Sequence, residues 1–363
     1  MRDSPRPAKG PLAGVRVLEF AGLGPAPYAT GLLSDMGADV VRLERPHIQA
    51  SGSLDLLSRG RVSMTVDLKD PGDLARCRAA ACAADVLIEG FRPGVMERLG
   101  LGPDELLKEN PRLVYGRMTG WGQTGPLAQT AAHDINYIAI TGALAMMGRP
   151  GEVPMPPNNL LGDFGAGSLF LAMGIVAALY ERERSGQGQV IDAAIVDGAA
   201  SFMTVYCGML KRDPTIMRRE NLPLGGDKAN YRCYACADGG YVSVGAMEPH
   251  FHAELLQRLG LPGALAGTPE EAAALETKFL ERPRDEWTAL FAGSDACFAP
   301  VLDLAEAQVH PHLSARQTYV EVDGVLQSAQ APRFSRTPGA VQGGPCKPGV
   351  GGVQRLRSWG VDV

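Results

Sequence analysis

Two side chains that could give or take protons stand where this sequence predicts the start of a helix. His133 follows the glycine-rich loop 120–126, and Asp163 follows the segment 158–162. An imidazole titrates near neutrality, and together with a carboxylate it forms a workable acid/base pair. Backbone N–H groups also point outward at a helix start, so a lone His or Asp there can simply cap the helix. The residues alone leave both interpretations open.

Two further segments could lie close to a ligand. Glu248 comes just after a predicted β-hairpin, where it could act on a substrate or merely place charge in front of a helix opened by Pro249. The loop 21–27 is glycine-rich and joins a strand to a helix. Pro25 and Pro27 interrupt it, so it lacks the GxGxxG sequence of a dinucleotide site. The loop predicts a tight turn near a ligand.

Positive charge follows several predicted strands. The residues concerned are Arg42, Arg45, Lys69, Arg92 and Arg98. The carboxyl ends of parallel strands share one edge of the sheet, and such sheets bind ligands at that edge. Arg and Lys side chains gathered there could hold a phosphorylated ligand. Ordinary surface charge is the alternative.

The first half of the chain alternates short β-branched runs with helical patterns. Strands are predicted at 15–20, 39–43, 63–68, 85–89, 112–118 and 189–195. Helices are predicted at 28–36, 74–83, 104–109, 135–147, 163–184 and 197–210. Alternation at this spacing is typical of βαβ units, and it predicts an α/β fold with a mostly parallel sheet.

The pattern changes after residue 210. Residues 211–229 lose their periodicity and gain charge, proline and glycine, which predicts a linker. The runs 231–237 and 241–246 flank Asp-Gly-Gly and predict a β-hairpin. Helices are then predicted at 250–259, 269–280 and 284–292, so this part reads as a smaller α+β domain. The tail after residue 338 is rich in glycine and proline, and we expect it to pack back on the first domain.

Composition excludes several classes of protein. The net charge of −5 leaves no basic excess for nucleic acid or an anionic membrane. The seven cysteines are odd in number and scattered, which favours a reducing compartment, and the pair Cys233 and Cys236 is predicted to lie in a strand rather than at a metal. The N-terminus lacks the pattern of a secretory signal, and the apolar segment 168–180 is too short to span a bilayer. We expect a cytoplasmic protein without a metal centre.

Several stretches carry more specific motifs. They are PLAGVRVLE (11–19), GADVV (37–41), DVLIEGFRPG (85–94), GWGQTGP (120–126), HDINY (133–137), GDF (162–164) and ADGGYVSVGAMEP (237–249). Together they resemble the family III coenzyme A transferases of the CaiB/BaiF superfamily, and within them the α-methylacyl-CoA racemases. The likeness covers most of the chain.

The resemblance implies a fold and an assembly. A large Rossmann-like domain that binds coenzyme A would span 1–195 and be completed by 335–363; a linker helix and loop would span 196–229, a small α+β domain 230–315 and a return linker 316–334. Family members form interlocked homodimers, with the active site between the large domain of one subunit and the small domain of the other. Coenzyme A, which enters as part of the substrate so that no separate cofactor is expected, would contact Arg45, Lys69, Arg92, Arg98 and Tyr137.

The resemblance also implies the catalytic residues. The aspartate shared by the family matches Asp163, which transferases use as a nucleophile and racemases as an acid/base. Racemases add a histidine, matched by His133, and a glutamate that hydrogen-bonds it, matched by Glu248. Transferases resembling the oxalate/formate enzyme carry a Gly-Gly-Gly-Gln loop, whereas residues 224–227 here read Leu-Gly-Gly-Asp. Both differences favour the racemase.

These residue types suit proton transfer next to a thioester. Such a proton is only weakly acidic, so its removal needs a base and a donor to the enolate oxygen, a role that we give to the backbone N–H of Asp134. Inversion needs a base on one face and an acid on the other, here His133 and Asp163, and Glu248 would orient the imidazole. We predict a racemase of 2-methylacyl-CoA esters acting by 1,1-proton transfer.

Two alternatives remain. Asp163 could instead transfer coenzyme A between carboxylic acids through an anhydride, or the chain could bind acyl-CoA without catalysis, although intact His133, Asp163 and Glu248 argue against the latter. The acyl chain is left open. Apolar residues that could line a tolerant pocket, or equally belong to the core, are Met146, Met147, Met155 and Leu160.

Overall fold

The structure is a computed structural model that describes residues 9–46 and 55–363. Contacts divide the chain into two compact units. Unit 1 comprises Met1–Thr141, Pro157–Phe202 and Ser314–Val363, and unit 2 comprises Gly142–Pro156 and Met203–Leu313.

Unit 1 is built on a six-stranded sheet in which every pair of neighbours is parallel, with the strand order β3-β2-β1-β4-β5-β6. The strands are β1 (Arg16–Phe20), β2 (Asp39–Glu44), β3 (Val62–Thr65), β4 (Val86–Glu89), β5 (Val114–Thr119) and β6 (Val190–Ala194). The predicted α/β fold with a parallel sheet is confirmed. The order turns back between β1 and β4, and doubly wound sheets bind their ligands at such a switch point.

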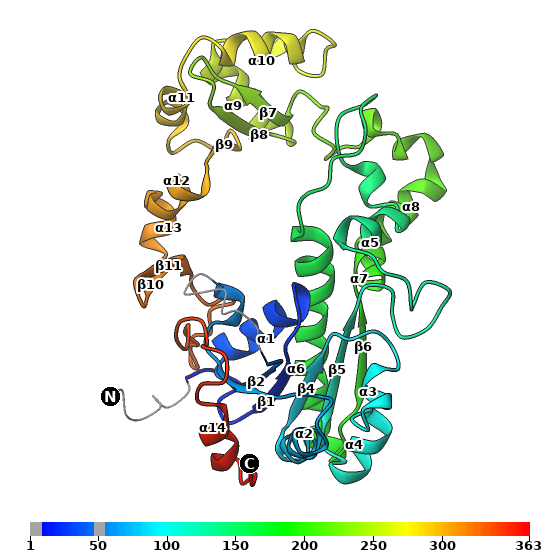
Figure 1. Ribbon diagram of the computed structural model, residues 1–363. Coiled ribbons are helices and arrows are strands. Elements are labelled where there is room, and N and C mark those ends of the chain that lie inside the picture. The colour runs from blue at the N-terminus through cyan, green and yellow to red at the C-terminus, as the bar shows by residue number, and fades with distance from the viewer. Residues whose placement is uncertain (1–8, 47–54) are drawn as a thin grey trace. The chain divides into compact units, whose positions relative to one another are not determined.

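Helices cover both faces of this sheet (Figure 1). On one face, α1 (Pro25–Asp35) and α6 (Leu169–Ser185) pack on each other and on the strands. The other face carries α2 (Pro71–Ala83), α4 (Pro103–Glu109) and the C-terminal α14 (Gly352–Ser358). Alternate residues of a strand point to opposite faces, so Leu18 and Phe20 of β1 both join the core on the face that α2, α4 and α14 cover.

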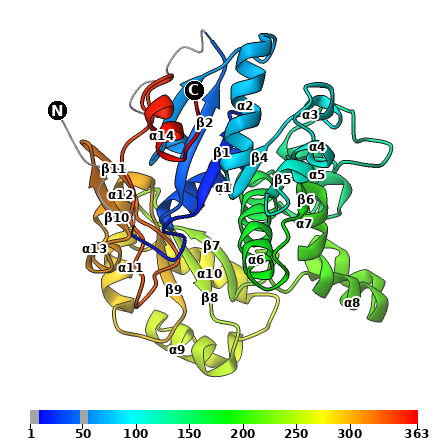
Figure 2. The same cartoon turned by 90° about the horizontal axis from the view of Figure 1, so that it is seen from below.

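The C-terminal tail is part of unit 1. Helix α14 lies against β2 and β3, and Figure 2 shows it beside β2 from below. Leu356 and Val361 join the buried core of that face. The indole Nε1 of Trp359 donates to Oδ2 of Asp39 at 2.8 Å. A further antiparallel hairpin of β10 (Tyr319–Val322) and β11 (Val325–Ser328) was not predicted.

The long helix predicted at 163–184 begins earlier, at Leu160. Its first part, Leu160–Ser168, is a π-helical segment that runs directly into α6, so Asp163 lies inside the first turn rather than in front of the helix. We call Leu160–Ser168 the π-segment. The stretch Leu160–Ser185 is long and apolar enough to cross a membrane by length and composition, which corrects the sequence-based estimate that this region is too short. In unit 1 it packs on α1, β5 and β6.

Two other predicted helices are interrupted. The helical stretch 135–147 ends with α5 (Asp134–Ile140), and a 3-10 turn follows at Leu144–Met146, after the chain has entered unit 2. The predicted helix 197–210 is divided into α7 (Ile195–Phe202) and α8 (Thr204–Arg212). Helical periodicity does not reveal either interruption, because both lie where the chain passes between the units.

Unit 2 contains a three-stranded antiparallel sheet of order β7-β8-β9. After α8, its helices and strands are β7 (Tyr231–Ala235), β8 (Tyr241–Gly245), α9 (Pro249–Leu259), α10 (Glu271–Phe279), α11 (Arg284–Phe291), β9 (Phe298–Val301) and α12 (Leu304–Val309); α13 (Pro311–Ala315) crosses into unit 1. The predicted hairpin and helices are present, whereas β9 was not predicted. Aromatic residues fill the core, among them Tyr234, Phe279 and Trp287.

Candidate active site

Asp163 and Asp134 are brought together in unit 1. The backbone N–H of Asp163, in the π-segment, donates to Oδ2 of Asp134 at 2.6 Å. Asp134 is the first residue of α5 and is only 9% exposed. Glycine before Asp163 leaves room for this contact, because a Cβ on Gly162 would lie 2.3 Å from the same Oδ2 and the Asp134 carboxylate would have to shift. The carboxylate of Asp134 therefore fixes the backbone that presents Asp163.

His133 is the N-cap residue of α5 and is exposed. Its backbone N–H donates to Oδ1 of Asn136 at 3.1 Å, which closes the first turn of the helix. His133 lies near enough to Asp163 for its charge to lower the pKa of that carboxyl group. The two groups that the sequence proposes for proton transfer are therefore electrostatic neighbours.

The loop after β1 covers the Asp163 carboxyl group. Gly24, the N-cap residue of α1, has a φ of 64°, and a Cβ placed on it would lie 3.1 Å from Oδ2 of Asp163. A side chain at Gly24 would therefore be strained by the backbone and would press on the carboxylate. Because this loop follows β1, the carboxyl group lies at the switch point of the sheet.

The pKa of Asp163 is raised from 3.8 to about 6: burial is the largest cause, the negative charge of Asp134 adds to it, and the charge of His133 opposes both. Burial also raises the pKa of Asp134, against the hydrogen bonds that its carboxylate accepts from the backbone of Asp163 and Gly162. A carboxyl group with a pKa near 6 exchanges its proton readily at neutral pH, which is what a general acid or base needs.

Replacing Asp163 with Asn is expected to stabilise the protein at alkaline pH. The folded state raises the pKa of this carboxyl group, so it binds the proton more tightly than the unfolded chain does, and stability is lost as pH rises from 3.8 through about 6. Asn cannot ionise and avoids this loss. The side chain is only partly buried, so we expect a gain of about 1 kcal/mol above about pH 7 and none below about pH 4. Thermal unfolding of both proteins across this range measures it, and a pH-independent difference would contradict it.

Tyr137 lies near the carboxyl groups of Asp163 and Asp134, but its hydroxyl is already hydrogen-bonded to the backbone. The hydroxyl donates to the carbonyl of Ala132 at 2.6 Å. The ring packs edge-on against the ring of Trp121, with the two ring centroids 4.8 Å apart. Burial and the nearby carboxylates of Asp163 and Asp134 raise the pKa of Tyr137. In this geometry Tyr137 holds the segment in front of His133, and its expected contact with coenzyme A stays a prediction.

The basic residues after the strands are divided between two environments. Arg45, Lys69 and Arg92 are exposed beyond the carboxyl ends of β2, β3 and β4, which share one edge because the strands are parallel. Arg98 is also exposed, at the end of the short helix α3 (Val95–Arg98). These four side chains are therefore available to a phosphorylated ligand.

Arg42 is not available to a ligand, which corrects its grouping with Arg45. Its guanidinium is buried and lies 2.9 Å from Oε1 of Glu19 and 2.9 Å from Oε1 of Glu44. Arg42 lies on the same face of the sheet as Glu44, because alternate residues of a strand face opposite ways, and as its register partner Glu19, so it compensates the two buried glutamates.

Glu248 belongs to unit 2. It is the exposed N-cap residue of α9, and Cys297 lies near enough for the charge of Glu248 to raise the pKa of the thiol, after the larger effect of burial. Its hydrogen bond to His133 stays a prediction. The candidate acyl-chain residues are not all core: Met155 of unit 2 is 66% exposed and Leu160 of unit 1 is 63% exposed.

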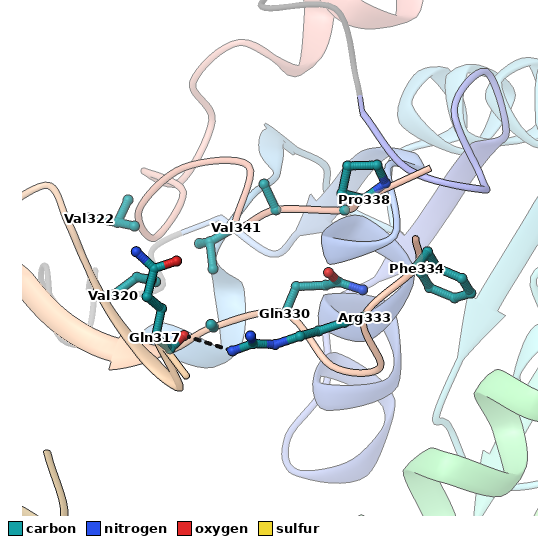
Figure 3. Close-up of a pocket in the computed structure, with 11 residues that line it drawn as sticks. Gln317, Val320, Val322, Gln330, Arg333, Phe334, Pro338 and Val341 are labelled. Atoms are coloured by element: carbon teal, nitrogen blue, oxygen red, sulfur yellow. Dashed lines mark hydrogen bonds between the residues drawn. The ribbon is translucent and has the colours of Figure 1, made fainter. Parts of the chain in front are cut away.

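A pocket of about 500 Å³ lies elsewhere in unit 1, between the β10–β11 hairpin and the segment 329–341 (Figure 3). None of the predicted site residues lines it. Its charged residue, Arg333, donates to the backbone carbonyls of Arg316 and Gln317. The pocket therefore offers no acid or base, and it is not the catalytic centre. Across residues 9–46 and 55–363, no cluster of His, Cys, Asp or Glu side chains could hold a metal ion.

Sequence reasoning missed two features of the site. It named Asp134 for its backbone N–H and did not foresee that the side-chain carboxylate accepts the N–H of Asp163 and helps to raise the pKa of the Asp163 carboxyl group. It also treated Gly24 as part of a tight turn, whereas this glycine makes room for the Asp163 carboxyl group. Gly162 and Gly24 were the signals in the sequence that a close approach occurs there, but only the fold shows which groups approach them.

The chain is similar to known proteins over nearly its whole length. The sequence profile of CoA-transferase family III matches residues 12–352. An α-methylacyl-CoA racemase from Mus musculus is 43% identical over 96% of this chain and 93% of its own length, and one from Homo sapiens is 39% identical over 90% of each. The crystal structure of a CaiB/BaiF family protein from Brucella suis superposes with a TM-score of 0.84 at 25% identity, covering 97% of this chain and all of the other.

Proposed function

The chain belongs to CoA-transferase family III, and within this family we propose that it is an α-methylacyl-CoA racemase, which interconverts the R and S forms of 2-methylacyl-CoA thioesters. The observation that carries the proposal is the pairing in unit 1 of an exposed imidazole, His133, with a carboxyl group of raised pKa, Asp163. The identity of 39–43% to racemases supports it.

The two groups divide the reaction between the faces of the substrate. One removes the proton from the carbon next to the thioester carbonyl, and the other returns a proton to the opposite face of the planar enolate. A pKa of about 6 lets Asp163 act as a base when ionised and as an acid when protonated, within the same pH range. Catalysis in either direction needs one group protonated and the other not, so each turnover leaves the pair ready for the reverse reaction.

The enolate oxygen has a donor at the start of α5. Asp134 is the first residue of that helix, where the backbone N–H groups have no acceptor within the helix. We propose that the N–H of Asp134 binds the thioester oxygen and strengthens its bond as negative charge develops there. One such donor contributes on the order of 10²–10³-fold in rate.

Coenzyme A would lie along the edge of the sheet where Arg45, Lys69 and Arg92 are exposed, and its thioester would reach the switch point at Gly24 and Asp163. Glu248 would hydrogen-bond the imidazole of His133 and fix its tautomer. We propose that the catalytic unit is an interlocked homodimer in which unit 2 supplies this glutamate. In such a dimer, the charge of Glu248 on unit 2 would orient the imidazole of His133 on unit 1, so the active site would need both units.

One experiment tests the function. A single enantiomer of a 2-methylacyl-CoA is incubated with the enzyme in deuterated water without any acceptor acid, and the α-proton is followed by NMR while chiral separation follows the stereochemistry. Exchange together with loss of chirality is the expected result. Absence of both, followed by acyl transfer once a carboxylic acid is added, would replace the racemase by a CoA-transferase with Asp163 as nucleophile.

Replacing Arg92 with Ala is expected to raise KM by about 10–100-fold while leaving kcat nearly unchanged. A charge-assisted hydrogen bond to phosphate contributes roughly 1.5–3 kcal/mol in the ground state and in the transition state alike. Added salt should weaken the binding of the substrate to the wild type, and it should therefore reduce the difference in KM between the wild type and Arg92→Ala. Arg112 is an exposed arginine just before β5, at the opposite edge of the sheet, so Arg112→Ala is the matched control. Equal changes in both variants would contradict a phosphate site at Arg92.

A further inference from the structure

The start of helix α1 is held by three side-chain donors on successive carbonyls. The hydroxyl of Ser168 lies 2.8 Å from the carbonyl oxygen of Pro25, the hydroxyl of Thr30 lies 2.9 Å from that of Ala26, and Nη2 of Arg61 lies 2.5 Å from that of Pro27. The donor side chains Ser168, Thr30 and Arg61 are all buried. This helix start directly follows Gly24, which covers the Asp163 carboxyl group.

Ser168 differs from the other two donors in what it joins. Its hydroxyl also lies 2.9 Å from the carbonyl oxygen of Asp163, five residues earlier in the π-segment. One hydroxyl proton is therefore shared between the residue that carries the catalytic carboxyl group and the first carbonyl of α1. The side chain is 0% exposed, so water cannot replace this contact without a rearrangement.

The contact ties the loop after β1 to the residue that carries the catalytic carboxyl group. Gly24 precedes Pro25, and it closes one side of the carboxyl group. The other charged or titratable groups that act on Asp163 come from α5 and its N-cap: the carboxylate of Asp134, the imidazole of His133 and the phenol of Tyr137. If the loop after β1 moved outward, water would enter on the Gly24 side while the α5 side stayed in place.

We propose that Ser168 is a positioning residue, which holds the loop at Gly24 against the Asp163 carboxyl group and so sets the geometry and hydration of the group that carries the proton. The proposal rests on the proposed racemase function. The rest of the interface does not depend on this hydroxyl, because Tyr28 of α1 also packs on Phe164 of the π-segment with ring centroids 4.5 Å apart. Loss of the hydroxyl should therefore loosen the loop without unfolding the unit.

The test compares two variants that each remove one buried hydroxyl donor from α1. Ser168→Ala breaks the link to Asp163, and Thr30→Val removes an equally buried hydroxyl on Ala26 while keeping the side chain's shape. Both should lower Tm by a similar amount. Only Ser168→Ala should lower kcat, by about 10-fold with little change in KM, because small displacements of a reacting group cost rate rather than ground-state binding. The acid limb of the pH–rate profile of Ser168→Ala should also lie at lower pH than that of the wild type.

A second readout does not use activity. The stabilisation at alkaline pH from Asp163→Asn reports the pKa of Asp163, and it should be smaller in the Ser168→Ala background than in the wild type or in Thr30→Val. If Ser168→Ala changes only Tm, with the pH–rate profile and the effect of Asp163→Asn as in the wild type, the proposal is wrong. If the wild type itself exchanges no α-proton, the racemase proposal fails, and the stability measurement alone still decides for or against the role of Ser168.

Discussion

Replacing His133 with alanine is expected to lower the rate of inversion by about 10²–10⁴-fold in both directions. Inversion needs one group on each face of the enolate, and the variant retains only Asp163. Proton exchange is expected to survive for one enantiomer, the one whose α-proton faces Asp163. That carboxyl group can remove the proton, exchange it with solvent and return a deuteron to the same face.

The measurement uses each enantiomer separately in deuterated water and records exchange and inversion in the same samples. Retained exchange of one enantiomer without inversion distinguishes the loss of one base from general damage to the site. His312→Ala is the control, because it removes an exposed imidazole in unit 2. Racemisation at the wild-type rate in His133→Ala would remove His133 from the mechanism.

Replacing Asp163 with asparagine is expected to cause the mirror-image result. Inversion should again fall by about 10²–10⁴-fold, but exchange should now survive for the other enantiomer, whose α-proton faces His133. Asn has nearly the same shape, and its backbone N–H can still donate to Asp134, so the local fold is kept. The expected gain in stability at alkaline pH shows in the same sample that the protein is folded.

The pattern of exchange in Asp163→Asn also separates the two candidate reactions. A transferase that forms an anhydride at Asp163 is expected to lose turnover with this variant, because the amide of Asn lacks the nucleophilic carboxylate that takes the acyl group. A racemase keeps exchange at one enantiomer. Asp104→Asn, which changes an exposed carboxylate in the first turn of α4, is the control. Exchange of the same enantiomer in both His133→Ala and Asp163→Asn would contradict a division of the two faces between them.

Much of the fold could be predicted because its signals are local. The strands of unit 1 are short β-branched runs separated by helical patterns, and this alternation requires crossover connections and hence a parallel sheet. The hairpin of β7 and β8 was evident from Asp-Gly-Gly between two alternating runs. Each of these elements is specified by residues within a single window of sequence.

Other elements carry no such signal. Strand β9 contains a proline and becomes a strand by pairing with β8, and the β10–β11 hairpin lies in a region of mixed polarity. The π-helical start of the helix that carries Asp163 also differs from an ordinary helix only in its hydrogen bonds. Pairing with distant segments decides these elements, so periodicity could not reveal them.

The sequence by itself determined which residues could do the chemistry. The motifs around His133 and Asp163 place an imidazole and a carboxylate at two helix starts, and these positions follow from capping chemistry and glycine-rich loops. The tertiary structure alone decided that the two starts meet, that Asp134 accepts the N–H of Asp163, and that Gly24 covers the carboxyl group. It also decided that Arg42 forms ion pairs with two buried glutamates while Arg45 stays exposed. The reason is physical: residue type sets which proton a group can carry, whereas burial and neighbouring charges from distant segments set its pKa and its partners.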